Sequence, residues 1–586
     1  MNMNELPTME CDVLVVGAGA GGLSTAITAK KNGMDVLVIE KEPVFGGTTA
    51  FSGGVLWIPL SPHARKAGYA DTREAVIRYM KAETGRWYDA PAVEAFIDRG
   101  PEMVEFFERE TEVKFIPTLY PDYHPHVDGG VDIGRSILAA PFDIRGLGKD
   151  MARLRPPLQT ITFIGMMFNS SNADLKHFFR FTKSAASFAY VVKRLANHVK
   201  ELALYRRGIN VTSGNALAAR LAKSALDLRI PIHTDTAAQE LIAEAGRVIG
   251  ALVKGPEGVR RIVARKGVVL AGGGFSHDRQ RIAKAYPHLR AGGEHFSPVP
   301  EGNTGDGARM AEHVGGRVDI RFSSPAAWMP TSKVPMGNGR HGAFPHLLDR
   351  YKPGIIGVLK NGKRFTNESN SYHDVGAAMV AAGQGKDTAM WLVCDQATIS
   401  KYGLGYAKPA PMPLAPMVRN GYLVKGASLA ELARNAGIDA AALEQTVREY
   451  NEGAVHGEDR QFGRGSTSFN RYLADAEHKP NPCVAPIGKG PYYALKVVVG
   501  DLGTFDGITT DVVGRVLDGT DQPIAGLFAV GNDRASVMGG NYPGAGITLG
   551  PIMTFGYITG RYLAGLEQQL AATPRTTEMA AHVVPV

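Results

Sequence analysis

The 586-residue chain is long enough for more than one domain or one large divided domain, and its 44% hydrophobic content supports a sizeable core. Its three cysteines, Cys11, Cys394 and Cys483, are far apart, which argues against a disulfide framework or a cysteine metal site. The polar, acidic first ten residues do not resemble a signal peptide, and no apolar run reaches the ~18 residues of a membrane span. We therefore expect a cytoplasmic globular protein.

The net charge of +8 belongs to one part of the chain. Residues 151–210 contain ten lysines and arginines but only one aspartate and one glutamate, so the rest of the chain is neutral overall. Any anionic partner is therefore expected at this segment.

Residues 13–40 predict a strand, a glycine turn, a helix and a second strand. Apolar runs at 13–16 and 36–39 flank an amphipathic segment at 23–31. The turn between the first run and the helix has the spacing Gly-X-Gly-X-X-Gly, formed by Gly17, Gly19 and Gly22.

Each glycine of this turn has a role in a dinucleotide-binding unit. Gly17 suits the tight turn, Gly19 the close approach of backbone to a pyrophosphate, and Gly22 the packing of helix on strand. The helix N-terminus directs N–H groups and a positive dipole end toward phosphates. Glu40, at the end of the second strand, can accept hydrogen bonds from a ribose, so the pattern predicts a Rossmann-type unit.

A loop of small residues follows at 46–54, where backbone can lie close to a flat ring system. It resembles the FAD loop of the flavoprotein family that includes succinate dehydrogenase, fumarate reductase and the 3-ketosteroid dehydrogenases. Gly47 stands where succinate dehydrogenases carry a histidine joined to the flavin. The resemblance therefore implies FAD bound without a covalent link.

Residues 157–208 form a basic amphipathic insertion. After an apolar stretch at 161–168, a helix is predicted over 174–207, because apolar residues recur at helical spacing at Leu175, Phe178, Ala185, Phe188, Val192, Leu195, Val199 and Leu202. The opposite face carries Lys176, Arg180, Lys183, Arg194 and Glu201.

Two interpretations of this helix stay open. It can lie on an anionic membrane surface, burying its apolar face and attracting headgroups. It can equally pack on its own core or on another subunit, because most surface helices are amphipathic. Nucleic acid is not expected, since its bases need aromatic platforms beside the charges and the aromatic residues lie largely on the apolar face.

Three further stretches resemble FAD-binding elements: residues 236–238, expected as a strand beside the adenine; 267–275, a buried strand entering a glycine turn; and 303–307, the start of a helical segment. Residues 526–532 predict another strand and turn, and a helix begins within 546–555. We predict an α/β fold with a discontinuous Rossmann-type FAD-binding domain at 1–323 and 490–586. An inserted α+β catalytic cap domain occupies 324–489.

The C-terminal motifs narrow the resemblance. Residues 501–504, 526–532 and 538–546 resemble the end of 3-oxosteroid 1-dehydrogenases, which desaturate the C1–C2 bond of a 3-ketosteroid. The family's Tyr-X-Gly-X-Gly element matches residues 542–546, with Ala545 where many members have proline.

The resemblance implies a catalytic set. It places the Tyr542 hydroxyl and the Gly546 N–H as donors to the C3 carbonyl, Tyr372 as the base and Tyr123 as its helper, although the sequence leaves open which of these two tyrosines takes the proton. It implies cofactor contacts at Gly17, Gly19, Ala20, Gly21, Gly22, Glu40, Lys41, Gly46, Gly47, Thr48, Thr49, Ser52, Gly53, Gly54, Ala238, Gly272, Gly273, Asp306, Gly531, Asn532, Gly546, Thr548 and Leu549.

Elementary chemistry agrees with these roles. Desaturation of a ketone removes a proton α to the carbonyl and a hydride from the β carbon, and two donors aimed at the oxygen stabilise the enolate charge. Tyrosine has an ordinary pKa of about 10, so a second hydroxyl and a positive dipole should stabilise its phenolate, and the rate should rise with pH. His124 and His126 have no carboxylate directly beside them on their loop and predict plain surface residues rather than a metal site.

Other functions stay open. A fumarate or urocanate reductase needs arginines to clamp a dicarboxylate, but the positions around Tyr372 and Tyr542 are neutral or apolar. A 3-oxosteroid 4-dehydrogenase or a dehydrogenase of another cyclic ketone uses similar chemistry. A non-catalytic flavin redox sensor leaves the three tyrosines unexplained. If the insertion contacts a membrane, it could admit a sterol-derived ketone with its side chain intact and pass electrons to quinone.

Overall fold

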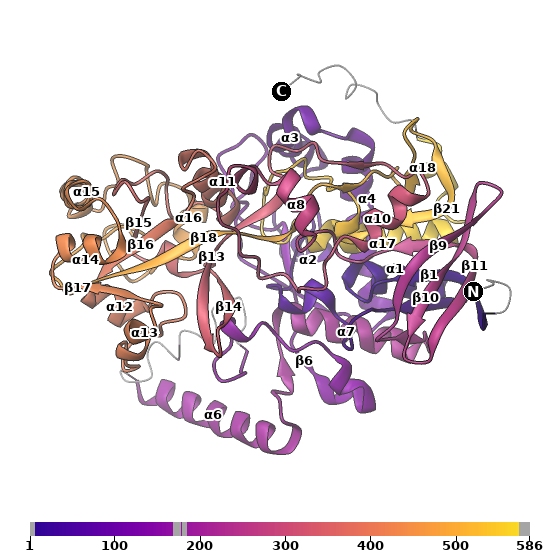
Figure 1. Ribbon diagram of the computed structural model, residues 1–586, viewed down its shortest axis with the longest axis horizontal. Coiled ribbons are helices and arrows are strands. Elements are labelled where there is room, and N and C mark those ends of the chain that lie inside the picture. Colours follow the sequence, from indigo (N-terminus) through magenta and orange to yellow (C-terminus); the bar gives the residue numbers. More distant parts are fainter. Residues whose placement is uncertain (1–5, 168–176, 178–183, 574–586) are drawn as a thin grey trace.

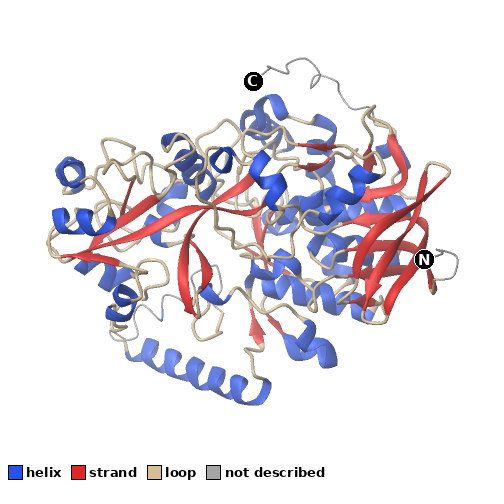
Figure 2. Cartoon of the chain, viewed as in Figure 1, coloured by secondary structure: helices blue, strands red, loops and turns tan. Residues whose placement is uncertain are grey.

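The computed structural model describes residues 6–167, 177 and 184–573, and the chain forms two units, each built around one large sheet (Figure 1). In the view of Figure 2 the strands of the first sheet lie at the right and those of the second toward the left. The N-terminal and C-terminal parts of the chain meet in the first unit.

The first sheet has the strand order β20-β21-β10-β11-β1-β2-β8, with β9 paired to β10. Strands β1, β2, β8, β11 and β21 are parallel, and β9 and β20 join through antiparallel pairs. Strand β10 is antiparallel to β9 and β11 but meets β21 in a parallel pair. Their bounds are β1 Thr8–Val16, β2 Val36–Ile39, β8 Ile232–His233, β9 Ala237–Glu244, β10 Arg247–Gly255, β11 Gly258–Leu270, β20 Arg515–Leu517 and β21 Pro523–Ala529. The strand–helix–strand order at the N-terminus and the return of the C-terminus to this sheet confirm the sequence prediction.

Helices α1 (Ala20–Lys31) and α17 (Leu549–Leu563) pack closely in the first unit. Glycines on α17 permit this approach: a Cβ on Gly556 would lie 2.2 Å from Ser24 Oγ, and one on Gly560 would lie 2.7 Å from Thr28 Cβ. Helix α4 (Ala90–Glu110) also packs on α17, and α7 (Ser213–Asp227) packs on α1. The C-terminal segment is thus held on both the strands and the helices of the N-terminal part.

Smaller elements complete this unit. They are α2 Pro62–Lys66, α3 Arg73–Thr84, the sheet of β3 Val55–Trp57, β5 Ser136–Ala139 and β4 Phe115–Pro117, the pair β6 Phe142–Asp143 and β7 Asn210–Val211, α10 Asp306–His313, the pair β12 Val318–Asp319 and β19 Gly507–Ile508, and α18 Gln568–Ala571. Helices α8 Arg279–Ala285 and α9 Pro287–Arg290 instead pack into the core of the second unit.

The second sheet is wholly antiparallel, in the order β14-β13-β18-β16-β15 with β17 paired to β18. The bounds are β13 Ala326–Gly337, β14 Arg340–Pro345, β15 Ile356–Val358, β16 Met390–Asp395, β17 Val424–Gly426 and β18 Tyr492–Thr504, with helices α11 Tyr372–Ala382, α12 Gln396–Tyr402, α13 Ala415–Arg419, α14 Leu429–Ala436, α15 Ala440–Ala454 and α16 Ser468–Tyr472. Strand β18 lies between β13 and β16, so residues 492–504 pair with the second sheet although the boundary predicted at 489 assigned them to the first unit.

The basic insertion contains α6, Ala185–Tyr205, capped by the Ser184 side chain, which accepts a hydrogen bond from the Ser187 N–H. The predicted helix over 174–207 lies outside the described residues at 174–176 and 178–183. Phe188, Val192 and Val199 of the predicted apolar face are 55%, 48% and 64% exposed. Figure 1 shows α6 at the lower edge of the molecule. The exposure of these three side chains means that this part of the apolar face is not buried in the protein's own core. Among the described helices none is long and apolar enough to cross a bilayer.

A buried ion-pair network ties the second unit together. Arg464, 1% exposed, donates to the backbone carbonyls of Ile355, Arg350 and Lys352 and to Ser369 Oγ. Its Nη1 lies 3.5 Å from Glu368 Oε2. The buried Arg464 guanidinium therefore has hydrogen-bond acceptors, and the three buried carbonyls have a donor.

Arg464→Met should destabilise the protein by about 3–5 kcal/mol, because it leaves buried carbonyls without donors. Thermal unfolding should show this as a lower melting temperature. Arg460→Met is the matched control on the same loop, since Arg460 is 62% exposed and should matter by less than about 0.5 kcal/mol. Equal melting temperatures for the two variants would contradict the network's importance.

Candidate active site

Three tyrosines from separate parts of the chain converge between the two units. The Tyr123 and Tyr372 hydroxyl oxygens lie 3.4 Å apart. The Tyr542 ring stacks on Tyr123 at 5.5 Å between centroids and meets the Tyr372 ring edge-on at 4.9 Å. All three are at least 92% buried, so the structure brings together the three residues that sequence motifs singled out.

Each tyrosine is fixed by its backbone. The Tyr123 N–H donates to the Pro543 carbonyl, which ties its loop to the segment that carries Tyr542. Tyr372 is the first residue of α11, whose N-cap Ser371 accepts from the Asp374 N–H. A helix N-terminus carries a partial positive charge, so the Tyr372 backbone stands where an anion is favoured.

Burial dominates the electrostatics of this cluster. It raises the pKa of Tyr372 and of Tyr123 well above the ordinary value, and it raises the pKa of Tyr542 although hydrogen bonds with Tyr372 and Thr548 oppose this. At Tyr372 the contacts with Tyr123 and Tyr542 raise the pKa in the same direction as burial. The expected stabilisation of a phenolate is not realised there, and all three tyrosines are neutral at pH 7.

Gly546 has a backbone conformation that suits glycine. Its φ is +95°, and a Cβ would lie 2.4 Å from the Val55 carbonyl oxygen. Its own carbonyl accepts from the N–H groups of Trp57 and Gly550. Among the hydrogen bonds of the described residues, none is donated by the Gly546 N–H.

His124 does not behave as the plain surface residue that the sequence predicted. Its Nδ1 lies 2.8 Å from Glu83 Oε1 on α3, and its Nε2 lies 2.9 Å from Asp374 Oδ2 on α11. Burial opposes a charged ring, but these two hydrogen bonds outweigh it and raise the pKa of His124 to about 10. The imidazolium therefore joins the loop of Tyr123 to the helix of Tyr372 across the two units. His126 is exposed as expected.

Two further groups support the tyrosines. Asp122 accepts from the Trp57 indole N–H and from Arg135, which fixes the residue before Tyr123. His373 accepts the Trp328 N–H on Nδ1 and has a hydrogen bond with the Gly540 backbone, two residues before Tyr542. Burial lowers the pKa of His373 to about 4, so this ring is neutral.

A glycine cradle lies at the carboxyl ends of the parallel strands β1, β2, β11 and β21, the edge where open α/β sheets bind cofactors. A Cβ on Gly17 would lie 2.2 Å from the Ala271 carbonyl oxygen, and one on Gly22 would lie 1.9 Å from the Gly17 carbonyl oxygen. A Cβ on Gly19 would have no neighbour nearer than 4.0 Å, which leaves room for a ligand. The α1 N-cap has no side-chain hydrogen bond, so the early N–H groups of Gly21 and Gly22 suit a pyrophosphate.

The loop at 46–54 lies against this cradle. The Gly46 N–H donates to the Ala18 carbonyl, and the Ala20 N–H donates to Thr49 Oγ1. Ser52 Oγ accepts the Gly54 N–H. A Cβ on Gly53 would have no neighbour within 4 Å, and one on Gly47 would approach Gly19 Cα at 3.5 Å.

The charged residues that were predicted to contact the cofactor already form hydrogen bonds within the protein. The Glu40 carboxylate accepts the N–H groups of Ala18 and Glu42, so a ribose would share its remaining lone pairs. Lys41 Nζ donates to Asp306 Oδ2 at 2.5 Å, and this pair closes the cradle. Ala238 lies on β9, paired with Val253.

The remaining candidates line the far wall. Thr48 Oγ1 accepts from Asn303 Nδ2, and a Cβ on Gly273 would lie 2.8 Å from the same nitrogen. Gly531 approaches Gly21 closely, and Asn532 follows it in the turn after β21. Thr548 hydrogen-bonds Tyr542, and Leu549 begins α17.

Sequence reasoning missed Asp533, which accepts the N–H groups of Gly272 and Gly274 and fixes the β11 turn. The position of this acid, directly after Gly531 and Asn532 in the sequence, could have indicated its role. It also missed His373 and the bridging role of His124, whose carboxylate partners are distant in sequence.

Comparison with known proteins agrees with this geometry. The family model described as "FAD binding domain" matches residues 12–549. A 4-oxocyclohex-2-ene-1-carboxylate 5-dehydrogenase of Sinomonas cyclohexanicum is 45% identical over 95% of this chain and 94% of its own length. A 3-oxosteroid 1-dehydrogenase of Mycolicibacterium smegmatis is 36% identical over 94% of this chain and 96% of its own.

Among solved structures, 3-ketosteroid Δ1-dehydrogenase from Sterolibacterium denitrificans, in complex with 1,4-androstadiene-3,17-dione, aligns with a TM-score of 0.86. It is 35% identical and covers 95% of this chain and 99% of its own. The chain belongs to the FAD binding domain family. Its cofactor is FAD, and it is an FAD-dependent oxidoreductase of the 3-ketosteroid 1-dehydrogenase family, acting on CH–CH donors.

His124→Gln should destabilise the protein near neutral pH, because Glu83 and Asp374 lose the cation between them. The folded-state pKa of His124, about 10, lies above its unfolded value of about 6.5. The imidazolium's contribution is therefore full below pH 6.5 and is lost by about pH 10. Melting temperatures across this range should converge at the alkaline end.

His126→Gln is the control for this comparison, since His126 is exposed on the same loop. Its melting temperature should equal that of the unmodified protein at every pH. A constant difference between His124→Gln and the unmodified protein up to pH 10.5 would contradict the charged bridge.

Proposed function

We propose that the protein desaturates a six-membered cyclic ketone next to its carbonyl group, converting a 3-oxo-4-ene steroid into a 1,4-dien-3-one. The observation that carries the proposal is the convergence of Tyr123, Tyr372 and Tyr542 with the unused Gly546 N–H. This set contains a base, a partner for that base and two donors for one oxygen.

The residues act as follows. The Tyr542 hydroxyl and the Gly546 N–H donate to the ketone oxygen and stabilise the enolate charge that develops as the α proton leaves. Tyr372 takes that proton, and the Tyr123 hydroxyl, 3.4 Å away, donates to the phenolate as it forms. Bound FAD supplies the acceptor for the hydride that leaves the β carbon.

The tyrosine surroundings favour an apolar ring system as substrate. The ring contacts of the tyrosines are with Phe469, Phe505 and the neutral His373. A fused steroid nucleus fits aromatic walls without needing a charged partner.

The second candidate substrate is a cyclohexenone carboxylate. It is favoured by the relative that is 45% identical and named for such a substrate, against 36% for the steroid dehydrogenase reported above. The desaturation chemistry is the same for both, so the ketone-binding and base residues serve either substrate. The two differ in whether the site must also hold a carboxylate.

The exposed apolar face of α6 supports a peripheral membrane contact, since Phe188, Val192 and Val199 together with the basic charge of the insertion fit an anionic bilayer surface. Such a contact brings the protein to apolar ketones and to a membrane quinone as electron acceptor.

Tyr542→Phe and Tyr372→Phe should each lower kcat about 10²- to 10⁴-fold while FAD remains bound, because they remove an oxyanion donor and the base. Stopped-flow reduction of the flavin by substrate measures this step alone. Tyr557→Phe is the matched control on α17 and should reduce its flavin at the normal rate. Normal reduction in both active-site variants would overturn the assignment.

Androst-4-ene-3,17-dione, cholest-4-en-3-one and 4-oxocyclohex-2-ene-1-carboxylate, each tested with a dye acceptor, should separate the substrates. A 1,4-dien-3-one identified by mass and ultraviolet spectrum supports a 3-ketosteroid as the substrate. Turnover of the carboxylate alone replaces it with the second candidate. Failure of all three with a reducible flavin contradicts the function.

A further inference from the structure

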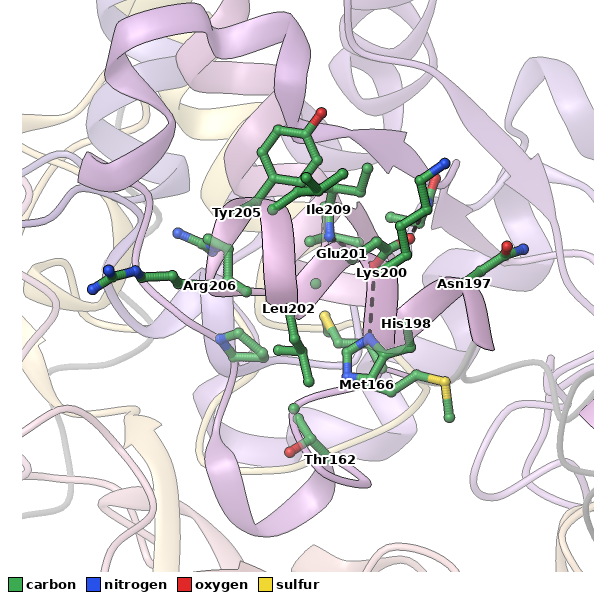
Figure 3. Close-up of a pocket in the computed structure, with 18 of the residues that line it drawn as sticks. Thr162, Met166, Asn197, His198, Lys200, Glu201, Leu202, Tyr205, Arg206 and Ile209 are labelled. Carbon is green, nitrogen blue, oxygen red and sulfur yellow. Dashed lines mark hydrogen bonds and ion pairs between the residues drawn. The ribbon is translucent and has the colours of Figure 1, made fainter. Parts of the chain in front are cut away.

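A large cavity lies between α6 and the body of the first unit, away from the tyrosines. Its volume is about 990 Å³, and it is lined by the inward side of α6, by residues of 145–167 and by the strand-forming segment after the helix. Figure 3 shows Met166, His198, Leu202 and Tyr205 at this cavity. The active-site chemistry leaves it unassigned.

The cavity wall is strongly basic. Six cationic side chains line it, Arg145, Lys193, Arg194, Lys200, Arg206 and Arg207, against one carboxylate, Glu201. Glu201 is already engaged, since it accepts the Ile209 N–H and Asn210 Nδ2 and lies 3.6 Å from His198 Nδ1. Arg145 is paired with Asp143, which does not line the cavity, so five cationic side chains of the wall remain against this one acid.

Arg207 shows the imbalance most clearly. Its Nη1 donates to the carbonyls of Met151 and Leu154, and its buried Nη2 has no hydrogen-bond partner among the described residues. Burial lowers the pKa of Arg207, because no carboxylate offsets its desolvation. A buried guanidinium of this kind is stabilised by a bound anion.

Part of the remaining wall is apolar, and so is the outer face of the same helix. Met166, Met167, Leu202 and Leu204 line the cavity beside polar residues such as Asn197 and His198. Outside, Phe188, Val192 and Val199 are 48–64% exposed. An occupant that is anionic at one end and apolar at the other matches both surfaces.

We propose that this cavity binds the phosphate headgroup of an anionic phospholipid while the exposed apolar residues of α6 enter the membrane interface. The phosphate lies against the cationic wall, and the acyl chains follow the apolar side of α6 toward the bilayer. The cavity thus makes the membrane contact selective for anionic lipid, where the apolar face alone would bind any bilayer.

Flotation with vesicles of phosphatidylcholine, with or without 30 mol% phosphatidylglycerol, tests the proposal on the FAD-loaded protein. We expect at least ~10-fold tighter binding to the phosphatidylglycerol vesicles. Arg207→Gln and the exposed pair Lys193→Gln/Lys200→Gln should each remove most of this preference. The pair guards against a folding defect from Arg207→Gln.

Lys66→Gln/Lys81→Gln is the matched control, since it removes two exposed lysines outside the insertion and should leave the preference intact. Val192→Asp/Val199→Asp should weaken binding to both vesicle types. Turnover of a water-soluble ketone should be normal in all these variants, which separates this proposal from the catalytic one.

Monomeric dihexanoyl phosphatidylglycerol distinguishes cavity binding from diffuse attraction to a charged surface. Calorimetry should give one saturable site per chain that Arg207→Gln abolishes, and inorganic phosphate at the same concentration should not displace the lipid. Displacement by phosphate would reassign the cavity to a free anion. Equal binding to both vesicle types, or an Arg207→Gln variant that keeps its preference, would overturn the proposal.

Discussion

The pairing of β21 with β11 is the constraint on which the rest of the site depends. It sets a strand from the C-terminal part of the chain, parallel and in register, beside a strand from the first half. The turn after β21 then meets the glycine turn of β1, where Gly531 approaches Gly21, and α17 packs on α1. Because α17 is fixed in this way, the loop before it delivers Tyr542 and Gly546 to the loop of Tyr123. One parallel pairing therefore positions the glycine cradle and the tyrosine cluster together.

Burial and the dipole of helix α11 have opposite effects on the pKa of Tyr372. Burial and the neighbouring Tyr123 and Tyr542 all raise the pKa of Tyr372, and only its place at the start of α11 favours an anion. Tyr372 is therefore neutral at pH 7 in the protein alone. Hydrogen bonds outside the cluster set its geometry: His124 ties two units through paired carboxylates, and His373 ties α11 to the Tyr542 loop.

The sequence predicted the parts of this architecture that depend on local pattern. The glycine spacing at residues 17–22, the strand before it and the helix after it follow from short-range rules, and the α+β character of the second unit was also foreseen. The predicted end of that unit fell before β18, because the sequence of an apolar strand does not reveal which of two sheets it will join. The tyrosine cluster was found by resemblance alone, since nothing local distinguishes three tyrosines among twenty. His124 was misjudged because Glu83 and Asp374 are 41 and 250 residues away.

The division of the first unit has a consequence for the order in which the protein can assemble on the ribosome. Residues 17–54 emerge early and carry the phosphate turn, but the cradle has no far wall until β21 and the turn at Gly531–Asp533 have been made. A nascent chain must therefore keep the apolar strands β1 and β11 apart from improper partners for most of its synthesis. The cradle is therefore complete only after these residues have been made, and a chain that loses its last tenth should retain the fingerprint of a dinucleotide-binding protein yet hold no cofactor.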